Sequence, residues 1–348
     1  MTMLDHYLAA FAKLKVDKAR WKDSPATNRR APYKPFLLLA VLDLIAQGQI
    51  PVNLITLTPD LREAFTLYCD RVLGVEKSVS IALPYYHLKS DDFWHLIATP
   101  GNDAALAAPI RSLALLQQLV AGVRLDDDLY TLLLNADTRD RLRQVLIETY
   151  FAPEMRPVVA EVGIISAQSF SYSQDILERP RRRPKFTLEE APTMDEAYVT
   201  EARTAGFRKA IVNLYQHTCA LCKIRLVTPE GRTAVSAAHI VPFSHSNNDD
   251  PRNGIALCGL HHWAFDTGVV AISDKQYTIK VSPVIPTPPD DPRTAALWSL
   301  ADQPILLPDT PSTIPLPLRC NGISAISTAA MLRYPSACKA HLALSRAE

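Results

Sequence analysis

The chain has 348 residues, of which 48% are hydrophobic, and its formal net charge at pH 7 is +1. This length allows about two domains, and the near-neutral total charge argues against a uniformly basic nucleic-acid binder. No apolar run approaches the roughly 18 to 20 residues that a membrane span requires, and the first residues lack the basic and apolar regions of a signal peptide. We therefore expect a soluble, cytoplasmic protein that does not enter a membrane.

Helical patterns dominate the first 152 residues. Apolar residues spaced i, i+3 and i+4 predict the first helix, and a Pro near the start with a Gly after the end delimits the next two. Helices are expected at about 4–14, 35–47, 59–73, 109–121 and 138–151. The last of them has Thr138 as its expected N-cap. Residues 78–98 predict a short strand or a turn instead, with Pro84 to His87 at its centre.

Basic residues concentrate near the N-terminus. Between Lys13 and Lys34 the sequence has eight basic residues against two acidic ones. Such a local excess can bind phosphate although the total charge is near neutral. The alternative is a solvated helix face followed by a loop.

A linker is predicted from about Ala152 to Asp195, where the sequence becomes rich in Pro, Ser, Glu and Arg. Its basic cluster, Arg179 to Lys185, is more simply explained as a solvated tether than as a DNA contact. Beyond the linker we expect helices at about 201–216 and 258–265 and strands at about 233–241, 269–272 and 277–281. The strand at 233–241 would present His239.

Four residues have the spacing of a structural zinc site. Cys219 and Cys222 form one C-x2-C pair, and Cys258 and His261 form a second, C-x2-H pair. A small unit buries too little apolar surface to be stable by packing alone, so a tetrahedral Zn²⁺ would hold its ends together. The alternative is that His261 is free and the site is three-coordinate or empty.

A second pattern, H-x13-N-x8-H, is interleaved with the first and consists of His239, Asn253 and His262. An imidazole can act as a general base near neutral pH or as a metal ligand. The two patterns together resemble the HNH, or ββα-metal, nucleases. This resemblance implies that His239 is the general base, that His262 binds the catalytic ion, and that Asn253 braces the loop or orients the base.

One position departs from the nuclease pattern. These nucleases usually have Asp or His as a metal ligand directly before the base, where this chain has Ala238. Asp266 is a tentative replacement ligand, although it could equally brace the turn at Gly268. Without a carboxylate, the catalytic ion would be Mn²⁺, Co²⁺ or Ni²⁺ more readily than Mg²⁺.

Two N-terminal segments, Arg29 to Leu39 and Leu83 to Trp94, resemble the sulfur-binding domains of phosphorothioate-dependent restriction endonucleases. The resemblance implies an apolar surface for the sulfur and cationic or polar groups for the DNA backbone. The implied DNA-binding residues are Arg29, Arg30, Tyr33, Lys34, Pro84, Tyr85, Tyr86, His87 and Lys89. The alternative is an ordinary turn with core aromatic residues.

We therefore predict an α+β protein. Its parts would be a mostly helical modified-DNA (sulfur)-binding domain at 1–152, a Pro/Arg-rich linker at 153–198, a zinc-stabilised HNH endonuclease domain at 199–285 and a C-terminal tail at 286–348. After about Leu306 the tail has no clear pattern. A shifted reading frame is one interpretation, and we assign the tail no function.

The expected function is that of a type IV restriction endonuclease that binds phosphorothioate-modified double-stranded DNA and cuts nearby. Since one HNH centre nicks one strand, we expect a homodimer. Two alternatives remain open: an HNH endonuclease directed by methylated bases, and a catalytically weak, zinc-stabilised DNA-binding protein.

Overall fold

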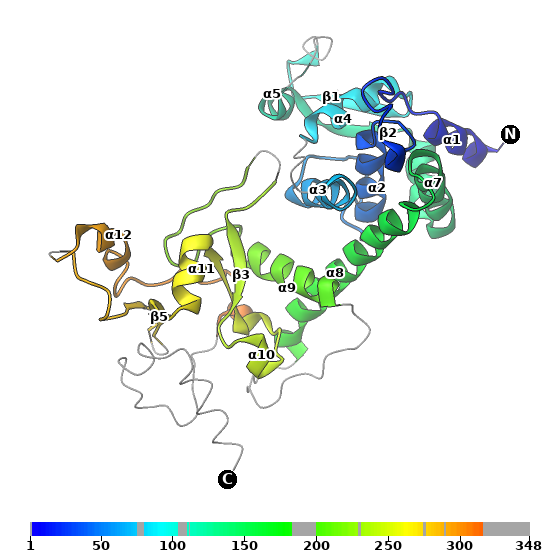
Figure 1. Cartoon of the computed structure of the whole chain (residues 1–348). Coiled ribbons are helices and arrows are strands. Elements are labelled where there is room, and N and C mark those ends of the chain that lie inside the picture. The colour runs from blue at the N-terminus through cyan, green and yellow to red at the C-terminus, as the bar shows by residue number, and fades with distance from the viewer. Residues whose placement is uncertain are drawn as a thin grey trace. The chain divides into compact units, whose positions relative to one another are not determined.

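The structure, a computed structural model, describes residues 2–74, 80–103, 110, 112–182, 200–228, 231–273, 276–288 and 290–315. The chain divides into two units (Figure 1). The first comprises residues 1–170 with 227–232, and the second comprises residues 171–226 with 233–348. Of the helices described, none combines the length and apolarity needed to cross a lipid bilayer.

The first unit is mainly helical over its described residues. Its elements are α1 (Met3–Ala12), α2 (Tyr33–Ala46), α3 (Pro59–Leu73), α4 (Ala82–His87), β1 (Trp94–Ala98), α5 (Leu113–Leu119), β2 (Val120–Leu125), α6 (Asp127–Leu134) and α7 (Ala136–Tyr150). The strands β1 and β2 pair antiparallel. The helices expected at 4–14, 35–47 and 59–73 are confirmed as α1, α2 and α3, whereas α6 and β2 were not predicted.

Side-chain caps explain where several of these helices begin. The Thr58 hydroxyl accepts a hydrogen bond from the Leu61 N–H at 3.2 Å, and Pro59 occupies the first helical position of α3. Helix α7 begins earlier than expected, because Asn135 and not Thr138 is its N-cap. The Asn135 side chain accepts from the Thr138 N–H at 3.2 Å, so Thr138 lies inside the first turn.

The strand or turn predicted at Pro84 to His87 is a helix, α4, which continues into a 3₁₀ turn, η2 (Leu88–Ser90). Strand β1 begins only at Trp94. The predicted helix at 109–121 is shorter in the structure, since α5 ends at Leu119 and β2 follows directly; residue 109 lies outside the described residues.

Helix α8 (Arg156–Arg182) occupies most of the segment predicted to be a linker. It runs for 27 residues, and Pro180 stands two positions before its end. The segment predicted as a linker is therefore helical over this part, and the boundary between the two units falls within the helix. Residues 183–199, which include the end of the basic cluster, lie outside the described residues.

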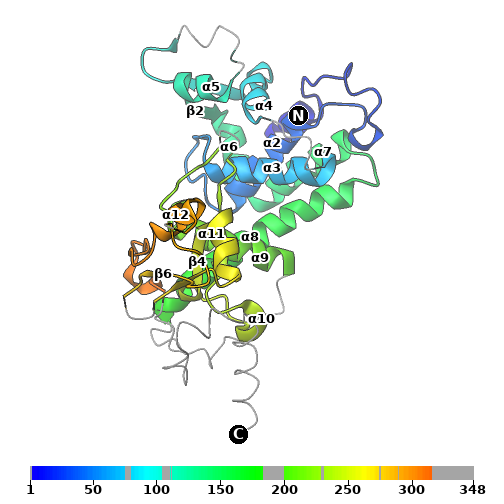
Figure 2. The ribbon, with the colours of Figure 1, turned by 60° about the vertical axis from the view of Figure 1, so that its left-hand side comes forward.

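The second unit contains a β-hairpin followed by a helix. Its elements are α9 (Thr200–Leu214), β3 (Val235–His239), α10 (Phe243–Ser246), β4 (Gly254–Cys258), α11 (Gly259–Asp266), β5 (Val270–Ile272), β6 (Ile279–Val281) and α12 (Ala295–Trp298). Strands β3 and β4 pair antiparallel with His239 opposite Gly254, and α11 lies beside this hairpin in both ribbon views (Figure 1, Figure 2). This confirms the predicted strand, helix and closing strands; β4 was not predicted.

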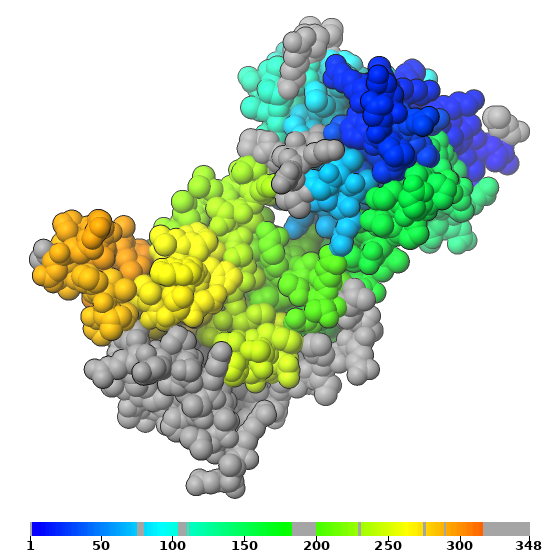
Figure 3. All heavy atoms as spheres, viewed as in Figure 1, coloured from blue at the N-terminus to red at the C-terminus, as the bar shows by residue number. Residues whose placement is uncertain are grey.

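Helix α9 packs against the other side of the hairpin because β4 begins with a glycine. A Cβ added at Gly254 would lie 2.3 Å from Ile211 Cδ1 and 3.1 Å from Phe207 Cζ, and both of these residues belong to α9. In contrast, α11 lies at the surface, where it is yellow in Figure 3. Its Trp263 side chain is 57% exposed. The hairpin is thus buried on the α9 side.

The described part of the C-terminal segment packs onto the second unit. Ile305 is buried, and the Leu306 N–H donates to the Ala220 carbonyl at 2.7 Å. The Tyr277 hydroxyl donates to the Pro315 carbonyl at 2.6 Å. Residues 316–348, which form most of the sequence without a clear pattern, lie outside the described residues.

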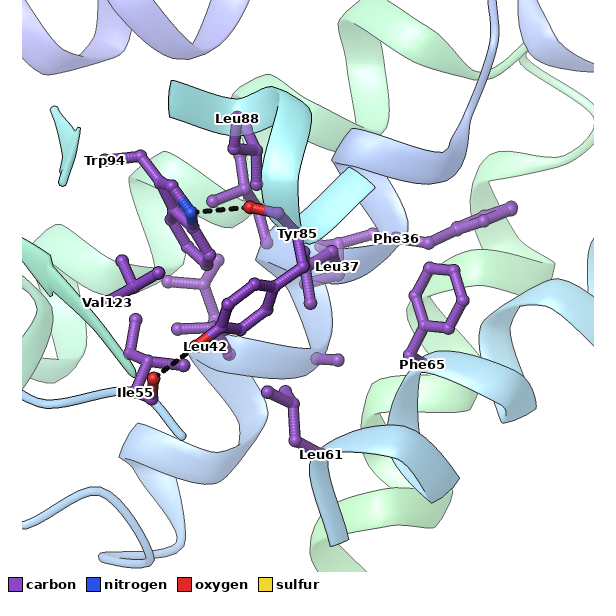
Figure 4. Packing of buried hydrophobic residues seen from close by; sticks show 14 of the residues in the cluster. Phe36, Leu37, Leu42, Ile55, Leu61, Phe65, Tyr85, Leu88, Trp94 and Val123 are labelled. Carbon is purple, nitrogen blue, oxygen red and sulfur yellow. Dashed lines mark hydrogen bonds between the residues drawn. The ribbon is translucent and has the colours of Figure 1, made fainter. Parts of the chain in front are cut away.

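The core of the first unit surrounds α2, in which every residue from Lys34 to Ile45 is buried. Figure 4 shows Tyr85 of α4 within this core. The Tyr85 hydroxyl donates to the Ile55 carbonyl at 2.6 Å, and the Trp94 indole N–H donates to the Tyr85 carbonyl at 2.9 Å. The Tyr85 hydroxyl and the Trp94 indole N–H therefore each have a hydrogen-bond partner inside the core, as the polar groups of buried aromatic residues usually do.

Candidate functional site

The four expected zinc ligands come together at one end of the hairpin. Cys219 and Cys222 lie in the loop after α9, Cys258 ends β4, and His261 lies in the first turns of α11. Their ligand atoms all lie within 4.8 Å of one another. His261 Nδ1 lies 3.5 Å from Cys219 Sγ and 3.2 Å from Cys258 Sγ, and the Sγ atoms of Cys222 and Cys258 are 4.0 Å apart.

These distances suit a tetrahedral zinc ion. Zn–S and Zn–N bonds of usual length place two sulfur ligands about 3.8 Å apart and a sulfur and a nitrogen about 3.6 Å apart. Burial and the neighbouring Cys219 and Cys258 raise the pKa of the Cys222 thiol to about 12, so adjacent thiolates need a cation to be stable here. The Cys3His group could therefore hold a metal such as zinc.

Backbone geometry forms the first half of this cluster. The Lys223 N–H donates to the Cys219 carbonyl at 2.9 Å, and Lys223 adopts a left-handed conformation with φ of 61°. This tight turn brings Cys219 and Cys222 to the same side. The Ala220 N–H donates to the Ala256 carbonyl at 2.8 Å and thereby joins the turn to β4.

His239 is the last residue of β3, and its ring contacts Asp249 at one edge and Phe207 on one face. Its Nε2 lies 2.7 Å from Asp249 Oδ1. The ring stacks on Phe207 with centroids 3.9 Å apart and an interplanar angle of 2°. The side chain is nevertheless 21% exposed, so the imidazole is oriented but open to solvent on part of its surface.

Asn253 is buried and holds the loop that follows His239. Its side-chain oxygen accepts from the Val241 N–H at 2.8 Å, and its amide group donates to the carbonyls of Val241 and Asn248, both at 3.0 Å. The Ile240 N–H also donates to the Asn253 carbonyl at 2.8 Å. Asn253 therefore fixes the path of the chain from β3 into the loop.

His262 is on α11 and reaches back to β3. Its Nδ1 lies 2.7 Å from the Ser236 hydroxyl, and its Nε2 lies 3.4 Å from an oxygen of Asp266, which is 62% exposed. Side chains alternate along a strand, so Ala238 shares a face of β3 with Ser236 and His239 lies on the opposite face. Ala238, which has no group that could bind a metal, is therefore on the face of β3 that contacts His262.

Within the described ranges, Cys3His is the one group of three or more His, Cys, Asp or Glu residues close enough to share a metal ion. His262 and Asp266 provide two ligand side chains for a second ion. A second ion would thus depend on oxygen atoms from outside the chain, such as those of a phosphate or water.

The sequence reasoning missed the carboxylate beside His239. Asp249 accepts hydrogen bonds from His239, from the Tyr172 hydroxyl of α8 at 2.6 Å and from Arg203 of α9 at 2.6 Å. The polar run 247–250 between His239 and Asn253 was the available signal, but it did not distinguish Asp249 from its neighbour Asp250. No spacing pattern connected Tyr172 or Arg203 to the site.

In the first unit, several of the residues expected to contact DNA are buried. Tyr85 is 0% exposed, and Pro84 and Tyr86 are also buried; Tyr85 and Tyr86 belong to the hydrophobic core. Lys34 is also buried, and its ammonium group pairs with Asp91 and donates to the Ser90 hydroxyl at 3.0 Å. These four side chains have little surface to present to DNA.

The other expected contacts retain accessible surface. Arg29, His87 and Lys89 are exposed, and Arg30 and Tyr33 are partly exposed. Burial lowers the pKa of His87, and the charges of Lys34 and Lys89 lower it further. Basic groups therefore lie close together around His87, and an anion bound there would relieve their repulsion.

Residues 219–273 match the family described as HNH endonuclease. The matched segment begins at Cys219, includes the hairpin and α11, and ends just after β5. The chain therefore contains an HNH endonuclease domain, which indicates nuclease activity on DNA. Tyr172, Arg203 and Phe207 lie outside the matched segment. No curated protein matches the chain.

Proposed function

We propose that the protein is a modification-dependent DNA endonuclease of the type IV restriction class, in which the N-terminal unit binds phosphorothioated DNA and the HNH domain hydrolyses phosphodiester bonds nearby. One observation carries the nuclease part. His239 is oriented at the end of β3, Asn253 holds the adjoining loop, and His262 contacts the same strand, all within the segment that matches the HNH family.

His239 accepts the proton of the attacking water in this proposal, because an imidazole is the side chain that most often acts as a general base near neutral pH. Asn253 keeps the loop in place so that His239 stays oriented. His262, with Asp266, would hold the divalent ion. When bound, that ion supplies positive charge at the scissile phosphate and at the leaving 3′ oxygen.

The ligand set also suggests which ions are effective. Ala238 offers no ligand, and the imidazole of His262 suits Mn²⁺, Co²⁺ or Ni²⁺ better than Mg²⁺. We therefore expect cleavage with these ions at lower concentrations than with Mg²⁺. The Cys3His group would hold a structural Zn²⁺ separately from this ion.

The choice of target is assigned to the first unit, since an HNH module contacts mainly the DNA backbone. The support is the resemblance of two N-terminal segments to sulfur-binding domains, together with the basic groups around His87. Given the burial of the α4 aromatics, the proposed contacts are Arg29, Arg30, Tyr33, His87 and Lys89.

Cleavage of matched duplexes tests the proposal. Three DNAs of one sequence are compared: unmodified, phosphorothioated and 5-methylcytosine-modified, each with Mg²⁺ and with Mn²⁺. We expect cutting of the phosphorothioated duplex alone. Cutting of the methylated duplex would favour a nuclease directed by methylated bases. Binding without cutting under all conditions would favour a DNA-binding protein in which Ala238 marks lost catalysis.

Two variants and one control separate binding from chemistry. His239→Ala should abolish cleavage and leave the affinity for modified DNA unchanged. Lys89→Ala should weaken binding, whereas Arg141→Ala, which removes an exposed basic residue of α7, should not. If His239→Ala lost binding as well as cleavage, His239 would have a structural role and the assignment of the base would be wrong.

A further inference from the structure

A buried carboxylate lies directly behind the proposed base. Asp249 is 1% exposed and accepts three hydrogen bonds, from His239 Nε2 at 2.7 Å and from the Tyr172 hydroxyl and Arg203 Nη1, both at 2.6 Å. Buried charges are rare unless they are paired and hydrogen-bonded. Three donors from α8, α9 and β3 thus converge on one carboxylate.

Asp249 remains ionised in this environment. Burial raises the pKa of the Asp249 carboxyl, but the hydrogen bonds from His239 and Tyr172 and the charge of Arg203 outweigh it, so the pKa lies below its ordinary value. An ionised carboxylate can only accept hydrogen bonds. His239 Nε2 must therefore carry a proton, and in the neutral ring the lone pair belongs to Nδ1.

The ring is also fixed in orientation. Phe207 stacks on one face of the imidazole. The centroids of the His239 and Phe243 rings are 5.7 Å apart, with an interplanar angle of 52°. Within the part of the chain that the structure describes, no hydrogen bond involves His239 Nδ1. Nδ1 is therefore the ring nitrogen available to a water molecule.

We propose that Asp249 is a positioning residue that selects the Nε2–H tautomer of His239 and thereby makes Nδ1 the atom that accepts the proton from water. This inference rests on the proposed function. The water oxygen forms a bond to phosphorus as its proton passes to Nδ1, and the bond from phosphorus to the 3′ oxygen breaks, with its electron pair going to that oxygen. The ring then carries a proton on each nitrogen, and Asp249 stabilises its positive charge.

Asp249→Asn tests the role of the carboxylate with little change in shape. The amide can turn its NH₂ group toward the ring, so the Nε2–H tautomer is no longer imposed. We expect kcat for the modified duplex to fall about 100-fold with KM unchanged. In ¹⁵N spectra of the full-length chain, the His239 ring should shift from the Nε2–H toward the Nδ1–H tautomer, with its signals assigned by their loss in His239→Gln.

Asp250→Asn is the matched control. Asp250 is the next residue and is also buried, but its carboxylate pairs with Arg252 at 2.8 Å and forms no hydrogen bond with His239. This variant should keep the Nε2–H tautomer of His239, so a fall in its kcat would reflect the loss of the buried Arg252 pair and not a change of tautomer.

Three results overturn the inference: Asp249→Asn keeps the wild-type kcat, it keeps the Nε2–H tautomer, or both Asn variants lose kcat equally without a change of tautomer. Failure of the proposed function gives a different result, in which the wild-type chain cuts no DNA at all. The ¹⁵N spectra would still decide in that case whether Asp249 sets the tautomer of His239.

Discussion

Ala238 precedes His239 on β3 and shares a face with Ser236, whose hydroxyl contacts His262. A carboxylate at this position would lie on the face of the strand that contacts His262, where His262 and Asp266 provide two ligand side chains. Since Mg²⁺ favours carboxylate ligands, Ala238→Asp should lower the Mg²⁺ concentration needed for half-maximal cleavage by roughly tenfold.

The matched control for this change is Ala237→Asp, because Ala237 is the adjacent alanine on the opposite face of the strand. The Mg²⁺ requirement of this variant should not improve. Equal Mg²⁺ titration curves for the two variants would show that the ion does not bind near this face of β3.

His87 should make DNA binding depend on pH. Burial and the charges of Lys34 and Lys89 lower the pKa of His87 below its ordinary value, so the ring is neutral at pH 7 and becomes charged only as the pH falls through that lowered pKa. Phosphate binds the charged form, so the affinity for modified DNA should rise as the pH falls through that lowered pKa. His87→Gln should remove this rise; a rise of equal size in the variant would exclude His87 as its cause.

At the scale of elements, Gly163 lets α8 pack closely against the rest of the first unit. A Cβ at this position would lie 3.0 Å from Arg143 Nη1 and 3.2 Å from the Tyr68 hydroxyl. Arg143 and Tyr68 both bind the buried carboxylate of Asp43, at 2.7 and 2.8 Å, so they cannot move without weakening those bonds.

Gly163→Ala should therefore destabilise the chain by about 1–3 kcal/mol in urea unfolding, although Ala normally favours a helix over Gly. The control is Ile164→Ala, since Ile164 is the next residue of α8 and its side chain is exposed. Its effect should be less than about 0.5 kcal/mol. A stabilising effect of Gly163→Ala would mean that α8 has room to move away.

The Cys3His cluster joins three elements, namely the loop after α9, the end of β4 and the start of α11. Cys222→Ser removes one of the four candidate ligands, so the chain should lose the zinc. Because zinc binding is coupled to folding, the melting temperature of the second unit should also fall by more than about 10 °C. Cys69→Ala should keep the zinc, because Cys69 is a buried cysteine of the first unit outside the cluster. Unchanged zinc content in Cys222→Ser, measured by metal analysis, would contradict this assignment.

At the scale of the whole molecule, one HNH domain per chain limits what one subunit can cut. A single centre hydrolyses one strand, so breaks in both strands should require two subunits. At low protein concentration, nicked DNA should therefore accumulate. Double-strand breaks should increase more steeply than linearly with protein concentration, as measured on supercoiled plasmid. A linear dependence with no nicked intermediate would exclude the homodimer.

Local sequence patterns predicted the Cys3His cluster and two helices, because these features depend on residues that are close together in the chain. The spacing of Cys219, Cys222, Cys258 and His261 predicted a cluster that the structure brings together, because two short pairs need only one hairpin between them to meet. Helices α2 and α3 were predicted for a similar reason, since Pro, Thr and Gly at their ends act within one turn.

The sequence could not show which polar and aromatic side chains are buried. Pro84 to His87 was predicted as a strand or turn with a surface for sulfur, whereas packing around α2 makes it a helix with Tyr85 inside the core. Likewise, the polar composition after Ala152 favoured a linker, although Val159, Val162 and Ile176 form buried positions along one continuous helix.

The amino-acid sequence by itself determined the HNH pattern, the candidate metal ligands and the candidate base, since each depends on residue type and short spacing. Only the tertiary structure decided how this candidate base is held, because Asp249 meets Tyr172 and Arg203 from 77 and 46 positions away in the chain. Such contacts form only when separate helices pack around one buried charge, and no local pattern records them.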